Sequence, residues 1–122
     1  MAEEWEDGVG ADEPAAPEGA NVLVLPHAGW AYSGAVAWRA VRAVRGRPFR
    51  RAVVLAPSHR AWIKNRLVAP EADAVSTPLG AIPVDRDWID RLALVAPVLR
   101  NDRVHLAEHA AQIEFQIGRA HV

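Results

Sequence analysis

The stretch ANVLVLPH, residues 20–27, decides the fold class of this chain. It is a short uncharged run, partly β-branched, that ends in a proline and a histidine. A run that is apolar on both faces is typical of a strand buried on both sides in a parallel sheet. The stretch RAVVLAPSH, residues 51–59, repeats the pattern and ends in a second histidine. Two buried strands are therefore predicted, over residues 20–25 and 51–56.

An amphipathic helix is predicted between these strands, over residues 34–44, and Gly46 and Pro48 close it. The face predicted to point inward carries Val36, Ala40, Val41 and Val44. Strand, helix and strand within about 35 residues form a βαβ unit with a right-handed crossover. We therefore expect an α/β fold, a partial three-layer sandwich with buried, largely parallel strands and a βαβ connection.

Shorter elements are predicted farther along the chain. They are a strand over residues 66–69, a turn over 77–80, an extended piece over 82–85, and a helix that starts at Asp85 or Asp87 and runs to about residue 96. The inner face of this helix is predicted to carry Trp88, Leu92 and Val95. The pattern over residues 104–115 leaves helix and strand open.

Composition excludes several classes of protein. The 122 residues include 15 acids, 14 bases and no cysteine, which excludes a disulfide framework, a cysteine-type zinc site, an iron–sulfur cluster and a thiol nucleophile. No apolar run approaches the ~20 residues of a membrane-spanning helix. The first residues lack the pattern of a secretion signal. The prediction is a cytoplasmic protein with no membrane partner.

Charge divides the chain unevenly. Residues 1–20 hold seven acids and no base, and we expect an acidic disordered tail there. The remainder is basic through thirteen arginines and one lysine, a bias typical of GC-rich genomes. No RNA- or DNA-binding motif accompanies these arginines, so a solvated helix face is preferred and no nucleic-acid partner is predicted.

His27 and His59 are the main candidate site residues, because each follows a predicted strand. Ligands bind at the carboxyl ends of parallel strands in open α/β sheets. Neighbouring strands lie ~4.8 Å apart, so the two imidazoles could meet at one metal ion. The alternative, two hydrogen-bonded structural or surface histidines, carries equal weight at this point. A catalytic non-haem iron also needs a third ligand, typically a carboxylate.

Four blocks of the sequence together resemble the successive motifs of the Memo family. They are PHAGWAYSG (26–34), LAPSH (55–59), TPLG (77–80) with Asp85, and Glu108-His109. In bacteria the family is called AmmeMemoRadiSam system protein B. The resemblance implies a fold similar to class III extradiol dioxygenases, which use non-haem iron. It also implies that His27 and His59 are metal ligands, with iron the expected metal and copper or zinc as alternatives.

The resemblance further implies what surrounds this chain. The family's third ligand is a cysteine, which lies downstream of the matched blocks, so we expect residues 21–116 to be the N-terminal half of a Memo-like domain. Alone, such a fragment is expected to be inactive. Residues 117–122 (IGRAHV) match the translation of a common sequencing adapter, and we expect this end to be non-native. Family association implies a radical-SAM protein and an AMMECR-type protein as partners.

Further pocket candidates are Tyr32, Ser58, Glu108 and His109. Ser58 beside His59 could suggest a nucleophile, but neighbouring residues of an extended segment point apart, which disfavours that interpretation. His105 and His109 have the i, i+4 spacing of a chelating pair on a helix, although surface histidines are favoured for His105. The leading hypothesis is a metal-binding, dioxygenase-like Memo-family fragment. The alternative is a non-catalytic metal- or peptide-binding adaptor that uses the same pocket.

Overall fold

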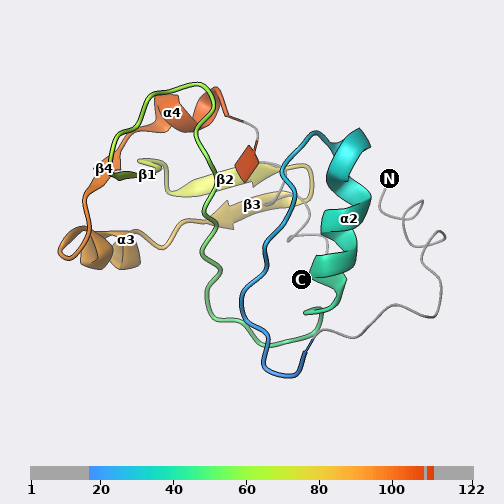
Figure 1. Cartoon of the computed structure of the whole chain (residues 1–122). Helices are drawn as coiled ribbons and strands as arrows, with labels where there is room; N and C mark the ends of the chain where they lie inside the picture. The colour runs from blue at the N-terminus through green and yellow to red at the C-terminus, as the bar shows by residue number, and fades with distance from the viewer. Residues whose placement is uncertain (1–16, 109, 112–122) are drawn as a thin grey trace.

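The computed structural model describes residues 17–108, 110 and 111. Helix α2 is followed along the chain by three strands, and then by a helix, a strand and a helix (Figure 1). The elements are α2 (Trp30–Arg42), β1 (Leu67–Ala69), β2 (Ala74–Thr77), β3 (Gly80–Pro83), α3 (Arg86–Ala93), β4 (Val98–Arg100) and α4 (Asp102–Leu106). The mixture of parallel and antiparallel strands with helices confirms the α/β fold class. The acidic tail up to residue 16 and the suspected non-native end lie outside the described residues.

Helix α2 carries the main apolar cluster. Ala37, Trp38 and Val41 are buried on it, and Leu25 and Trp30 pack against them. The predicted helix is confirmed, and it begins four residues earlier than expected, at Trp30. Its inner face is rotated from the prediction, because the side chain of Val36 is 56% exposed. A tryptophan has a much larger apolar surface than a valine, so the burial of Trp38 outweighs that of Val36.

The two sheets contain two strands each. Strands β1 and β4 are parallel, with Leu67 opposite Val98. Strands β2 and β3 form an antiparallel hairpin in which Thr77 pairs with Gly80. Pro78 and Leu79 form its turn, and Gly80, which follows them, has a φ of +118° that favours glycine. The predicted strand over residues 66–69 and the predicted turn over 77–80 are thus confirmed, whereas β2 occupies part of an expected loop.

Helix α3 begins where its capping residue predicts. Oδ1 of Asp85 accepts a hydrogen bond from the backbone N–H of Trp88 at 2.9 Å. Ile89 is the buried residue of this helix, Trp88 and Leu92 are half-buried, and the helix ends at Ala93. The prediction that Val95 faces inward is wrong, because its side chain lies beyond the helix and is 84% exposed. Residues 104–106, the start of the region left open between helix and strand, belong to helix α4 (Asp102–Leu106).

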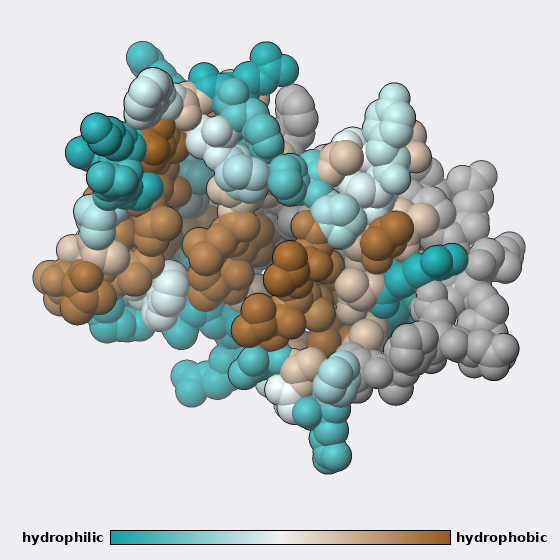
Figure 2. All heavy atoms as spheres, viewed as in Figure 1, coloured by the Kyte–Doolittle hydropathy of each residue, from teal (hydrophilic) through white to brown (hydrophobic). Residues whose placement is uncertain are grey.

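The strands predicted over residues 20–25 and 51–56 are not formed, which corrects the expected βαβ unit. Both segments lie outside the strands of the structure and run in the same direction, in blue and green in Figure 1. Val22, Val24 and Leu55 are 77%, 95% and 77% exposed. A strand buried on both faces needs a cover on each side. Apolar side chains instead gather at the surface in the part of the view where these segments run (Figure 2).

None of the helices in the described part of the chain has the length and apolar character required to span a bilayer.

Candidate functional site

His27 lies in the loop that leads into helix α2, and Ser33 fastens this loop. The Ser33 hydroxyl donates a hydrogen bond to the carbonyl oxygen of Ala28 at 2.9 Å and lies 3.4 Å from that of Pro26. Ser33 is only 6% exposed. Its position on the inner face of α2 therefore ties the backbone on both sides of His27 to the first turn of the helix.

His59 lies in the loop that follows residues 51–56, and Glu108 holds it. One carboxylate oxygen, Oε2, accepts a hydrogen bond from the backbone N–H of His59 at 2.6 Å. The other, Oε1, lies 3.0 Å from Nδ1 of the His59 ring. The Glu108 side chain is 9% exposed and that of His59 is 52% exposed. A buried carboxylate therefore contacts both the main chain and the ring of one histidine.

These contacts determine the charge of Glu108. The hydrogen bond from the His59 backbone, followed by that from its ring, lowers the pKa of Glu108 to about 2 against the opposing effect of burial. A carboxyl group with this pKa is ionised at neutral pH. The site therefore contains a fixed negative charge beside His59.

The two candidate ligands come together. The ring centroids of His27 and His59 lie 5.2 Å apart, and the ring planes are inclined by 38°. The predicted approach of the two histidines is therefore present, although the strands expected to produce it are not. Their role as metal ligands stays a prediction. Among the residues that the structure describes, no three or more His, Cys, Asp or Glu side chains are grouped closely enough to hold a metal ion.

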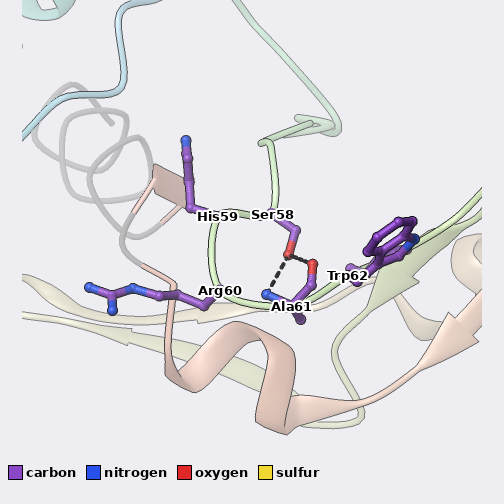
Figure 3. Close-up of a pocket in the computed structure, with 6 residues that line it drawn as sticks. Ser58, His59, Arg60, Ala61 and Trp62 are labelled. Atoms are coloured by element: carbon purple, nitrogen blue, oxygen red, sulfur yellow. Dashed lines mark hydrogen bonds between the residues drawn. The ribbon is translucent and has the colours of Figure 1, made fainter.

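A shallow hollow of about 420 Å³ lies beside His59 and is lined by residues 58–63. Figure 3 shows the side chains of His59, Arg60 and Trp62 leaving this loop in different directions. The Ser58 hydroxyl donates to the carbonyl of Ala61 at 2.7 Å and accepts from its backbone N–H at 3.3 Å. Ser58 is thus engaged in a local turn with Ala61 rather than in a hydrogen bond with His59.

The remaining candidates are dispersed. Tyr32 lies in the first turn of α2, and its side chain is 87% exposed. His105 lies on α4, where its Nε2 atom is buried without a hydrogen-bond partner in the described part of the chain. Helix α4 ends at Leu106, and His109 lies outside the described residues.

Two contacts of the site were not predicted from the sequence, that of Glu108 with His59 and that of Ser33 with the His27 loop. Glu108 was a candidate, but its contact with His59 spans 49 positions and leaves no periodic signal. Ser33 belongs to the PHAGWAYSG motif but was not a candidate site residue. The sequence feature that could have identified this contact is a serine on the inner face of an amphipathic helix. A hydroxyl buried there needs a hydrogen-bond acceptor.

Comparison with known proteins finds relatives of this chain. A MEMO1 family protein of Schizosaccharomyces pombe is 32% identical over 113 residues, which are 89% of this chain and 36% of that protein. One from Thermotoga neapolitana is 34% identical over 96 residues, covering 76% of this chain and 34% of the relative. One from Thermoplasma acidophilum is 30% identical over 93 residues, with coverages of 75% and 34%.

The chain thus spans about a third of the length of these curated relatives. No solved structure matches it significantly. The model of the family described as Memo-like protein matches residues 5–118, nearly the whole sequence. On this match, and on relatives from fungi, bacteria and archaea, the chain belongs to the Memo-like family.

Proposed function

We propose that His27 and His59 supply two ligands to one divalent transition metal, in a Memo-like domain similar to the class III extradiol dioxygenases. Iron is the expected metal, with copper and zinc as alternatives. The observation that carries the proposal is the 5.2 Å separation of the two ring centroids. These rings come from loops 32 positions apart in the sequence.

The donor set suits such a metal. Neutral imidazole is a good ligand for iron, copper and zinc. Two imidazoles that bind one metal at about 2.1 Å, with an N–metal–N angle of about 90–110°, have ring centroids about 4.5–5.2 Å apart. The observed separation agrees with the upper end of this range. The resemblance assigns the third position to a cysteine, a residue type absent from this chain. The described part of this chain therefore supplies two of the proposed ligands, His27 and His59.

Bound iron(II) would supply the redox chemistry of a non-haem-iron dioxygenase in the whole protein. The residues of this chain would hold and orient it. Ser33 fixes the loop of His27, and Glu108 contacts the loop of His59. Two neutral imidazoles leave the charge of a divalent ion uncompensated, and the buried Glu108 carboxylate provides a negative charge next to one of them.

The adaptor hypothesis is favoured by a different observation. Tyr32 and Trp62 are 87% and 89% exposed, and each lies within five residues of one of the two histidines. Exposed aromatic side chains are common anchors of protein–protein interfaces. Oxygen uptake with catechol-type compounds by an iron-loaded full-length protein would support the enzyme. Absence of uptake across a broad panel, with peptide binding that Trp62→Ala weakens, would support the adaptor.

Metal affinity of the 122-residue chain tests the ligand assignment. Equilibrium dialysis against Zn²⁺, and against Fe²⁺ under anaerobic conditions, would compare the wild-type chain with His27→Ala and His59→Ala. Each substitution should lower the affinity more than about tenfold, because it removes a ligand. His105→Gln is the matched control and should leave the affinity unchanged. Unchanged affinity in either alanine variant, with the fold intact by circular dichroism, would reject the assignment of that histidine.

A further inference from the structure

We propose that Glu108 is a positioning residue that holds His59 in the tautomer protonated at Nδ1 and so leaves Nε2 as its ligating nitrogen. The metal part of this inference rests on the proposed function, whereas the tautomer part does not. The contact that carries it is the pair of hydrogen bonds between the Glu108 carboxylate and His59.

The geometry determines which ring nitrogen carries the proton. A carboxylate is an acceptor only, so the 3.0 Å contact between Oε1 and Nδ1 requires a proton on Nδ1. A neutral imidazole carries one N–H, and Nε2 therefore has a free lone pair. Histidines that bind metals usually donate their other ring N–H to a carboxylate or a carbonyl. The Glu108–His59 pair has this form.

Glu108 holds more than the ring. Its second oxygen accepts the His59 backbone N–H at 2.6 Å, so one side chain fixes both the main chain and the side-chain orientation of that residue. Both oxygens are thus used toward His59, and Glu108 is 8% exposed. A carboxylate engaged in this way is poorly placed to ligate a metal itself. The positioning role is therefore preferred over a direct one.

Replacement by glutamine changes the proton pattern with little change of shape. The amide of Gln has one acceptor oxygen and an NH₂ group that donates. If the oxygen keeps the backbone N–H of His59, the NH₂ group faces Nδ1 and favours the tautomer protonated at Nε2. Glu108→Gln should therefore place the proton on the nitrogen that the metal needs.

Nitrogen-15 NMR of the histidine-labelled, metal-free 122-residue chain reads the tautomers directly. The His59 signals are assigned from their loss in His59→Ala. In the wild-type chain His59 should show the Nδ1–H pattern, and in Glu108→Gln it should shift toward Nε2–H. Glu18→Gln, a change at an exposed glutamate, should leave His59 as in the wild type. A wild-type His59 found as Nε2–H, or as an even mixture, would overturn the inference without any variant.

Zinc affinity separates this inference from the proposed function. Glu108→Gln should weaken Zn²⁺ binding by about 10–100-fold, as expected for the partner of a metal-bound histidine. If His59→Ala does not weaken Zn²⁺ binding but the tautomer depends on Glu108, the metal proposal fails and the positioning of His59 stands. If His59→Ala weakens binding but Glu108→Gln alters neither tautomer nor affinity, the positioning role is rejected and the metal proposal stands.

Discussion

The guanidinium of Arg51 donates two hydrogen bonds to a single carboxylate oxygen of Asp85, from Nε at 2.9 Å and from Nη2 at 2.5 Å. The other oxygen of Asp85 caps helix α3 by accepting from the backbone of Trp88. The guanidinium also lies 5.6 Å from the centroid of the Trp88 ring. Asp85 therefore attaches Arg51 to the start of α3. Arg51 is the first residue of segment 51–56, which pairs in no sheet of the described structure.

This ion pair predicts a specific dependence of stability on pH. The hydrogen bond from Arg51, followed by that from the Trp88 backbone, lowers the pKa of Asp85 below 3.8, its unperturbed value. Ionised Asp85 therefore stabilises the folded chain above the pKa of the unfolded state. That contribution is lost as the pH falls through the lower pKa of the folded state. Arg51→Met should make the free energy of unfolding fall less steeply with acid below about pH 4.

Urea unfolding at a series of acidic pH values measures this dependence. Arg50→Met is the matched control, because Arg50 is an exposed neighbour outside the Asp85 contact. Glu108 also titrates in acid, and it does so in all three proteins, so only the difference between the curves reports on Asp85. Identical curves for the wild type and Arg51→Met would show that the pair has no effect on stability.

Helix α2 shows how far periodicity predicts structure. The spacing of apolar residues identified a helix here, and the helix is present. The same spacing placed Val36 and Val41 together on the inner face, yet Val36 is 56% exposed and Val41 is 9% exposed. Periodicity treats apolar residues as nearly equal, whereas the helix rotates to bury Trp38. The existence of the element was therefore predictable, and its exact orientation was not.

The two valines give a matched pair of substitutions. Val41→Ala removes two buried methyl groups from the cluster around Trp38 and should cost about 2 kcal/mol of unfolding free energy. Val36→Ala makes the same chemical change at an exposed position of the same helix and should change it by less than about 0.5 kcal/mol. Chemical denaturation monitored by tryptophan fluorescence would measure both. Equal losses would mean that Val36 is buried in solution.

Residues 20–25 and 51–56 show a second limit of the sequence pattern. Their apolar content is that of buried strands, but a strand also needs a partner edge and a cover, which depend on distant parts of the chain. The positions of His27 and His59 were predicted correctly as neighbours, because both segments still run in the same direction (Figure 1). The Glu108 contact was not predictable, since nothing local connects residues 49 positions apart.

Ser33 gives a test of the His27 loop. Ser33→Ala removes the hydroxyl that donates to the carbonyl of Ala28, and a typical hydrogen bond contributes about 1 kcal/mol. If the bond holds His27 in its ligating position, the affinity for Zn²⁺ should fall by about fivefold. Ser76→Ala, on the exposed side of the hairpin, is the control and should have no effect. Zn²⁺ affinity that Ser33→Ala leaves unchanged would show that the loop is held without this hydroxyl.

The exposed apolar side chains of residues 20–25 and 51–56 predict self-association. Val24 and Leu55 are 95% and 77% exposed on segments that pair in no sheet of the described structure. Extended apolar segments with free backbone groups promote edge-to-edge contacts between molecules. Sedimentation velocity should therefore show association that increases with protein concentration. The double variant Val24→Thr/Leu55→Thr should reduce it, because threonine keeps the preference for extended backbone and lowers the apolar area.

The unfolding midpoint and a control variant distinguish self-association through these two segments from association caused by general unfolding. The double variant should leave the unfolding midpoint nearly unchanged, since both side chains are already mostly in solvent. Leu106→Gln changes a leucine of similar exposure, 78%, on helix α4, and should leave the association as in the wild type. If Leu106→Gln reduces association as much as the double variant, any exposed leucine would suffice and the two segments would have no special role. A chain that stays monomeric at all concentrations would mean that these side chains are covered in solution.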